Sequence, residues 1–176
     1  GPEASWANGA RWRALVDACR SAQLESRRIE TTSRATVGAG YAAAKKVVAR
    51  RCTAVVAYDD QMALGLIRGL QAMGVKIPRD VSVVGFDNTE MGRLLEPGLT
   101  TLDAPLRAQG RMAVSYLASI ANGASLASPT LTLPVKLMVR PSTGYARRNR
   151  VSPALGTTRV SASAAKVATS MSDGSR

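Results

Sequence analysis

Residues 53–87, TAVVAYDDQMALGLIRGLQAMGVKIPRDVSVVGFD, decide the fold class of this chain. The segment opens on an apolar run at 53–58 and closes on another at 81–86, and both are typical of strands buried on both faces. Between them, apolar side chains at helical spacing predict a helix over 61–73, which Gly74 ends as a C′ residue. A strand, a helix and a second strand in this order indicate a parallel sheet.

The same alternation continues on both sides of this segment. The chain is therefore predicted to be α/β, with a mainly parallel sheet flanked by helices. Further helices are expected over 8–23, with Asn8 as N-cap, and over 38–51 and 106–121. Further strands are expected at 28–31, 99–102, 131–133 and 135–139. The side chains predicted to face inward from the helix at 106–121 are Met112, Ala113, Tyr116, Leu117 and Ile120.

The charge of the chain is strongly basic but not concentrated. Its 176 residues include 24 Lys and Arg against 12 Asp and Glu, for a net charge of +12. Residues 145–176 contribute +5 of this charge and lack periodicity, so they are predicted to form a disordered basic tail. Because residues 1–144 contain no block of five or six like charges, a solvated arginine-rich surface is the favoured interpretation.

The composition also excludes several classes of protein. No apolar run approaches the roughly 20 residues that span a bilayer, and no signal peptide is visible, so we expect a cytoplasmic protein without a membrane partner. The chain has no histidine, which excludes Ser-His-Asp and Cys-His catalysis and histidine-dependent zinc sites. Cys19 and Cys52 are isolated, and we expect them to be reduced core residues. No cofactor is expected.

Carboxylates follow both apolar strands of the opening segment. Ligands bind at the carboxyl ends of strands in parallel sheets, which is where Asp59, Asp60 and Asp87 fall. Asp60 is predicted to cap the helix that begins at Gln61. Asp59 and Asp87 have no such structural duty and are predicted to contact a ligand. The same carboxylates could hold Mg²⁺ in a small α/β enzyme, but no phosphate-binding motif accompanies them, so no metal site is predicted.

Three blocks of the chain resemble LacI-type (lac and galactose repressor) transcription regulators. Residues 53–66, TAVVAYDDQMALGL, are similar to the family segment "tAvva.nDxmAlG". The block at 74–113, which contains GVKIPRDVSVVGFD and LTTLDAP, and the segment LPVKLMVRPSTG at 133–144 match later family motifs in order and at family spacing. The resemblance covers about residues 1–144.

This resemblance implies the periplasmic-binding-protein-like fold, in which crossover strands join two α/β lobes and a small effector binds in the cleft between them. Residues 1–144 would be an incomplete effector-binding and dimerisation domain, mostly second lobe, with the helix at 106–121 returning to the first lobe. The family pattern places Gly1 and Pro2 directly after a central strand of the second lobe. We therefore expect a truncated sensor half that lacks this strand and is not a well-behaved monomer.

The resemblance also carries functional residues to positions of this chain. Arg11 matches an arginine that grips effector hydroxyls or carboxylates, a task suited to its rigid donor fork. Asp59 lies where the family often has Asn or Asp lining the cleft, and Asp87 matches a cleft aspartate that accepts hydrogen bonds from sugar hydroxyls or base nitrogens. Ser5 occupies a variable contact position. One arginine among carboxylates favours a carbohydrate effector.

The chain departs from the family pattern at two positions of the cleft. Many members carry an aromatic residue where this chain has Ala35, and a polar residue is common at Ala7. The positions implied to form an interface between second lobes of a homodimer are Leu64, Arg68, Leu94 and Leu95.

The function implied is non-enzymatic: effector sensing and dimerisation in a LacI-type repressor. Operator DNA would be bound only through an N-terminal helix-turn-helix that is missing here. The alternatives are a sugar-binding protein of a transport system with the same fold and the small α/β enzyme.

Overall fold

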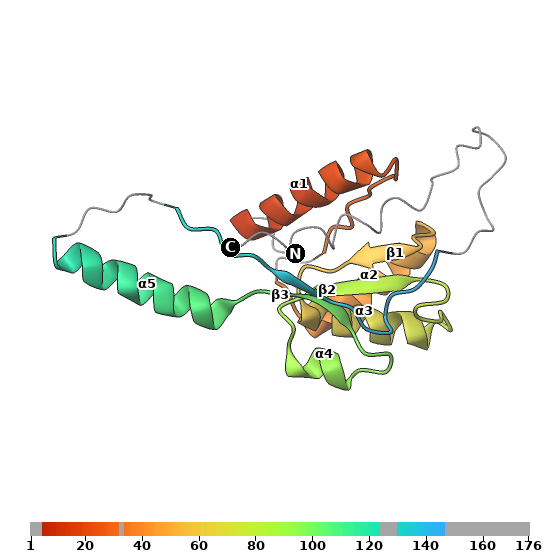
Figure 1. Cartoon of the computed structure of the whole chain (residues 1–176). Helices are drawn as coiled ribbons and strands as arrows, with labels where there is room; N and C mark the ends of the chain where they lie inside the picture. The colour runs from red at the N-terminus through yellow and green to blue at the C-terminus, as the bar shows by residue number, and fades with distance from the viewer. Residues whose placement is uncertain (1–4, 32–33, 124–129, 147–176) are drawn as a thin grey trace, which may run out of the picture.

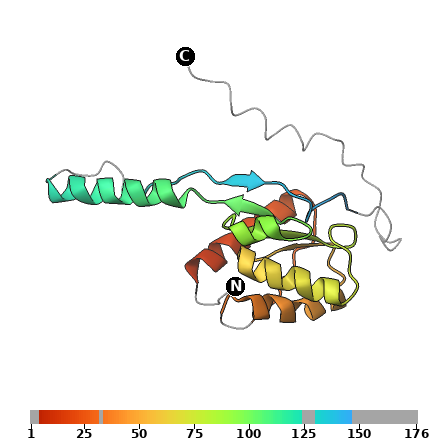
Figure 2. The same cartoon turned by 90° about the horizontal axis from the view of Figure 1, so that it is seen from below.

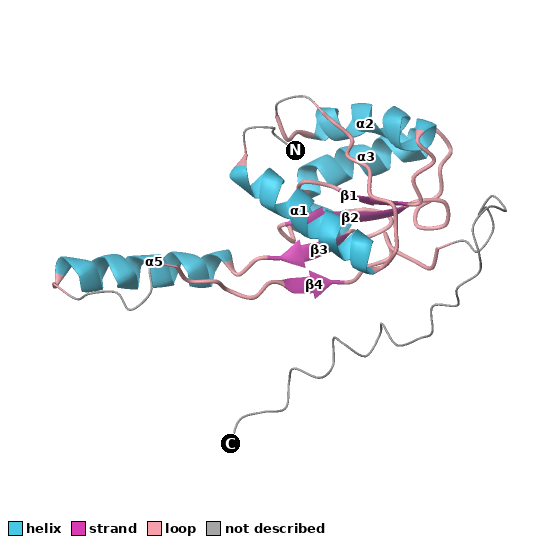
Figure 3. Ribbon diagram, turned by 90° about the horizontal axis from the view of Figure 1, so that it is seen from above, coloured by secondary structure: helices cyan, strands magenta, loops and turns pink. Residues whose placement is uncertain are grey.

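Short apolar runs of the chain form the strands of one sheet. The computed structural model describes residues 5–31, 34–123 and 130–146. In these residues the sheet has four strands in the order β1-β2-β3-β4 (Figure 3). They are β1 (Ala54–Val56), β2 (Ser82–Phe86), β3 (Thr100–Asp103) and β4 (Lys136–Met138). The first three run parallel and β4 runs antiparallel to β3, which confirms the predicted α/β class with a mostly parallel sheet.

The helices lie close to their predicted positions, with one addition. They are α1 (Trp6–Ser21), α2 (Val37–Ala49), α3 (Asp60–Ala72), α4 (Glu90–Leu94) and α5 (Leu106–Ala121). Helix α4 was not predicted, although Thr89 and Glu90 have the residue types of a helix start. The Thr89 hydroxyl accepts from the Gly92 amide at 3.3 Å. No helix in the described ranges is long and apolar enough to span a bilayer.

The core lies between the sheet and the helix pair α2 and α3, which cover one of its faces (Figure 2). Glycines let the two helices approach closely: a Cβ on Gly65 would overlap the Val37 carbonyl, and one on Gly40 would overlap that of Met62. The fully buried side chains of this core include Val47, Ile67, Leu70, Val83 and Leu99. Cys19 and Cys52 are free and half-buried. Cys52 packs against the core as predicted, whereas Cys19 is not part of it.

Two predicted strands do not form. At 28–31 the Arg28 and Glu30 carbonyls accept from the side chains of Arg50 (3.4 Å) and Lys46 (2.8 Å) instead of from a neighbouring strand. At 131–133 the reason is register. Because Asp103 pairs with Lys136, extension of β4 by two residues would bring Pro134 opposite Pro105, and neither proline has an N–H to donate.

The strand predicted at 53–58 is shorter and less buried than expected. Within the described residues β1 pairs with β2 alone and therefore lies at the sheet edge. Ala54 and Val56 are exposed, the latter by 48%, and Val55 is half-buried. A strand buried on both faces was thus the wrong prediction.

Helix α5 has the predicted bounds but not the predicted burial. It extends away from the rest of the described chain in Figures 1 and 2, and none of its residues is buried. Leu117 is 67% exposed and Ile120 is 50% exposed, so these side chains do not face inward as expected. The reason is that no described element lies on its apolar side beyond the segment at 131–135.

Parts of the earlier predictions lie outside the described residues. These parts are Gly1 and Pro2 at the beginning and residues 147–176 of the predicted tail.

Candidate functional site

Helix α1 brings Arg11 to the carboxyl ends of β1 and β2. The Arg11 guanidinium carbon lies 3.6 Å from the centroid of the Phe86 ring and 4.7 Å from that of Tyr58. Arg11 Nη1 also donates to the Tyr58 backbone carbonyl at 2.5 Å. Because a cation over an aromatic face is attracted by the ring's negative charge density, both rings hold the guanidinium in place. The sequence-predicted Arg11 is therefore a rigidly placed cation at the strand ends.

Ser5 lies beside the same group. Its Oγ is 3.3 Å from the Tyr58 hydroxyl and accepts from the Asn8 amide at 3.3 Å. Ser5 is thus the N-cap of α1, and Asn8, which was predicted to cap this helix, lies within its first turn. The helix begins at Trp6, two residues before the predicted range of 8–23, and its cap moves from Asn8 to Ser5.

Asp87 follows Phe86 at the end of β2. Its φ is +106° and that of Asn88 is +52°, so two consecutive residues adopt a conformation that L-residues rarely take. Partial desolvation raises the pKa of Asp87; the Arg11 charge opposes this, and the Asp60 and Asp59 charges add to it. Arg11 lies over the ring of Phe86, the residue before Asp87, so the Arg11 charge acts on the Asp87 carboxyl.

Of the two adjacent aspartates after β1, the one that caps α3 is not the one predicted. Asp59 is the N-cap of α3, because its Oδ1 accepts from the Met62 amide at 2.8 Å. Asp60, predicted as the cap, is the first residue of the helix and is only 2% exposed. The backbone of Asp59 is extended, with φ −146° and ψ 177°, so the helix begins one residue earlier than predicted. Ligand contact by Asp59 stays a prediction.

The aspartates do not form a cation site. Across the ranges that the structure describes, no group of three or more His, Cys, Asp or Glu side chains could hold a metal ion. A hollow of about 370 Å³ lies elsewhere in the described chain, between α5 and residues 131–135. Its lining includes none of Ser5, Arg11, Asp59 and Asp87. The candidate site is therefore an open surface at the strand ends.

Comparison with known proteins matches this arrangement to one family. Residues 1–143 match the model of the periplasmic binding protein-like domain. The chain belongs to this family. The transcriptional regulator MalR of Streptomyces coelicolor, of the HTH type, is 38% identical over 133 residues, which are 76% of this chain and 39% of MalR. The chain thus spans about two-fifths of the length of this relative.

Solved structures of this family show the same fold. The regulator CelR in complex with cellobiose superposes with a TM-score of 0.72 at 30% identity, covering 81% of this chain and 44% of that chain. The dimeric Lac repressor with an 11-residue C-terminal deletion superposes with a TM-score of 0.76 at 27% identity, covering 84% and 54%. The LacI-type resemblance read from the motifs is confirmed, and these relatives are regulators, not enzymes.

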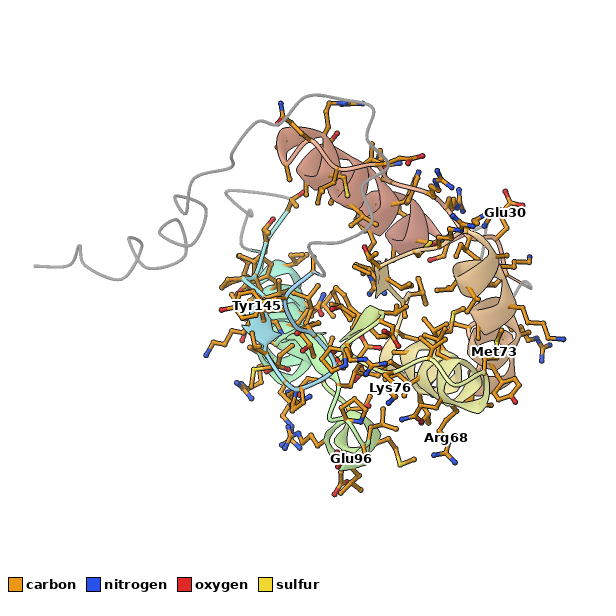
Figure 4. All side chains as sticks on the ribbon, turned by 90° about the vertical axis from the view of Figure 1, so that its right-hand side faces the viewer. Glu30, Arg68, Met73, Lys76, Glu96 and Tyr145 are labelled. Atoms are coloured by element: carbon orange, nitrogen blue, oxygen red, sulfur yellow. The ribbon has the colours of Figure 1, made fainter. Side chains whose placement is uncertain are left out.

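In this LacI-type domain the predicted interface residues lie on two neighbouring helices. Leu64 and Arg68 are one turn apart on α3, with Leu64 half-buried and Arg68 at the outer surface (Figure 4). Leu94 ends α4 and is 76% exposed, while Leu95 packs partly against the core. Leu64, Arg68 and Leu94 are accessible to a partner, whereas Leu95 also supports its own chain.

Sequence reasoning missed the two aromatic residues of the site. Phe86 is the last residue of β2 and Tyr58 lies two residues after the end of β1. Each immediately precedes a predicted ligand aspartate. The strand-end rule that selected the aspartates applies equally to the residues before them. Both rings could therefore have been assigned to the same edge of the sheet.

Proposed function

We propose that this chain is the effector-sensing and dimerising part of a LacI-type transcriptional repressor that acts in the cytoplasm. Its effector is a carbohydrate bound beside Arg11 and Asp87. Operator DNA is bound by a helix-turn-helix segment outside this chain, of the kind named for the relative MalR.

The observation that carries the proposal is the stacking of Arg11, from α1, on Phe86, the last residue of β2 and the residue before Asp87. Arg11 is held by Phe86 and Tyr58, and Asp87 directly follows Phe86. A guanidinium donates only and a carboxylate accepts only, so the pair suits a ligand whose groups both donate and accept. Sugar hydroxyls do both. The complex of the related regulator CelR with cellobiose supports this class of ligand.

The regulator is favoured over a sugar-binding protein of a transport system. Both would have the same fold, but the curated relatives with high identity to this chain are transcriptional regulators. A ligand at Arg11 and Asp87 would change DNA affinity by binding one arrangement of the regulator more tightly than another.

The same proposal includes a homodimer formed by α3 and α4. Support comes from exposed apolar side chains of α4: Leu94 is 76% exposed and Met91 is 60% exposed. Helix α4 contacts α3, which carries Leu64 and Arg68. Such side chains favour association when they form a contiguous patch. The related Lac repressor was solved as a dimer.

Calorimetric titration of the chain with cellobiose, glucose and ribose tests the proposal. We expect Arg11→Ala and Asp87→Ala to weaken binding of the preferred sugar at least about tenfold, because each removes a charged hydrogen-bonding partner. Arg13→Ala, an exposed position on the same helix, is the matched control and should bind as the wild type does.

Light scattering on the same samples tests the dimer. The Arg11 and Asp87 variants should keep the mass of the wild type, whereas Leu94→Glu should halve it and leave sugar binding intact. Unchanged affinity in both site variants would overturn the site. Failure of the wild type to bind any of the three sugars would overturn the carbohydrate assignment.

A further inference from the structure

We propose that Asp60 is a positioning residue of the effector site: its buried carboxylate fixes residues 87–89 so that Asp87 is presented beside Arg11. The proposal rests on the proposed function for the identity of Asp87 as a ligand contact. The contacts of Asp60 with Thr89 and Thr101 are independent of that proposal.

Asp60 is a buried charge whose oxygens are occupied by donors from distant parts of the chain. Oδ2 accepts from the Thr89 amide at 2.7 Å and from the Thr89 hydroxyl at 3.0 Å. Oδ1 accepts from the Thr101 hydroxyl at 2.6 Å. A buried carboxylate is costly unless such bonds replace its hydration, so removal of a donor weakens the whole arrangement.

Two glycines leave space for the Asp60 carboxylate. A Cβ on Gly85 would overlap Asp60 Oδ1, and a Cβ on Gly92 would lie 3.3 Å from Oδ2. Gly85 lies in β2 and Gly92 in α4, so glycines on both sides of residues 87–89 leave room for this side chain. The carboxylate therefore touches the strand before the segment and the helix after it.

Asp87 and Asn88, within the segment 87–89, have a backbone conformation that their surroundings must stabilise. Asp87 and Asn88 both have positive φ, which persists in non-glycine residues only where the surroundings impose it. The Asp87 amide donates to the Leu102 carbonyl at 2.8 Å, and the Asn88 amide donates to the Thr101 hydroxyl at 3.3 Å. Thr101 thus accepts from Asn88 and donates to Asp60, which links the carboxylate to the residue after Asp87.

The same carboxylate sets the beginning of α4. The Thr89 hydroxyl donates to Asp60 and accepts from the Gly92 amide at 3.3 Å, so Thr89 is at once a partner of Asp60 and the N-cap of α4. Asp60 therefore links residues 87–89 to the beginning of α4.

A second support holds the segment from the other side. Arg140 Nη2 donates to Asn88 Oδ1 at 2.6 Å, and Arg140 Nη1 donates to the Leu99 carbonyl at 2.8 Å. This contact offers a rival explanation of how Asp87 is placed. The proposal requires that loss of the Asp60 contacts loosens residues 87–89 while the Arg140 contact is still present.

Amide hydrogen exchange, followed by NMR on the full chain, tests this requirement without a ligand. We expect the Asn88 and Thr89 amides to exchange at least tenfold faster in Asp60→Ala and in Thr101→Val. Thr101→Ser keeps the hydroxyl and should restore wild-type exchange. Asp59→Asn is the matched control, because it neutralises the neighbouring carboxylate and keeps a residue that caps helices well.

The exchange pattern separates local from global effects. Amides of α2, such as that of Val47, should exchange at the wild-type rate in Thr101→Val. Unchanged exchange at Asn88 and Thr89, or equal acceleration throughout the chain, would overturn the proposal. So would loosening of these amides in Arg140→Met but not in Thr101→Val.

Sugar binding supplies the second readout. With a sugar that the wild type binds, affinity should fall at least tenfold in Thr101→Val, with Asp87 still present, and should return in Thr101→Ser. Accelerated exchange with unchanged affinity would overturn the positioning role. If the wild type binds no sugar, the proposed function fails, and the exchange data alone decide whether Asp60 holds the segment.

Discussion

At the scale of single residues, adjacent carboxylates have opposite environments. Asp59 is half-buried and caps α3, whereas Asp60 is buried among hydroxyl and amide donors. Their order along the chain does not reveal this difference, because either aspartate can cap a helix by its chemistry. The backbone conformation at Asp59 decides which one does.

The charge of Asp87 makes a testable contribution to the pH dependence of stability. Partial desolvation raises the pKa of Asp87 above its ordinary value of 3.8; Arg11 opposes the shift, and Asp60 and Asp59 add to it. Between 3.8 and the raised pKa the native chain therefore binds more protons than the unfolded chain. The free energy of unfolding consequently falls as the pH rises through this window.

Asp87→Asn should remove this fall in the free energy of unfolding with rising pH, because asparagine does not titrate. At pH 7 we expect the variant to be more stable than the wild type, by less than about 1 kcal/mol because Asp87 is exposed and screened by solvent. This difference should shrink as the pH falls toward 3.8. Urea denaturation at pH 4 and pH 7 measures it, with Asp17→Asn on the exposed side of α1 as control. A difference between variant and wild type that does not depend on pH would contradict the expectation.

At the scale of elements, the close contact between α2 and α3 depends on glycine. A Cβ at Gly65 would overlap the Val37 carbonyl, so one helix must shift to accept it. Gly65→Ala should therefore destabilise the chain by about 1–3 kcal/mol, the usual cost of overpacking. Thermal or urea unfolding, followed by circular dichroism, measures this change.

Gly110 in α5 provides the matched control. It has open space where its Cβ would be, and alanine is the better helix former, so Gly110→Ala should stabilise α5 by up to about 1 kcal/mol. Equal destabilisation by both substitutions would show that the contact between α2 and α3 does not decide the outcome.

Elements were predicted well where the signal is local. The periodicity of α5 gave its bounds, and the apolar run at 81–86 matches β2. The strands expected at 28–31 and 131–133 do not form, because a strand needs a partner at the correct register. That partner is a property of distant residues, such as Pro105 opposite Pro134.

At the scale of the whole molecule, α5 presents apolar side chains to solvent. Val114 and Leu117 are each 67% exposed on a helix that buries none of its residues. The double substitution Val114→Gln and Leu117→Gln should reduce self-association of the chain at high concentration, because both apolar side chains are exposed to solvent and available for contact with another copy. The melting temperature should change little.

Light scattering over a concentration series and a thermal melt measure these two expectations. Leu70→Ala is the contrasting control, since Leu70 is fully buried and its truncation should cost about 2–5 kcal/mol. Destabilisation by the double substitution as large as that of Leu70→Ala would show that α5 is packed in solution. Association that persists in the double variant but disappears in Leu94→Glu would assign it to α3 and α4.

The sequence by itself determined the α/β class, the order of most elements, the family and the strand ends at which a ligand would bind. These follow from periodicity and from motifs within short segments. Only the tertiary structure decided that Arg11 stacks on Phe86, that Asp60 is buried, and that α5 and β1 are exposed. The physical reason is that partners come from far along the chain: Asp60 is held by residues 29 and 41 positions away. No local pattern specifies such pairs.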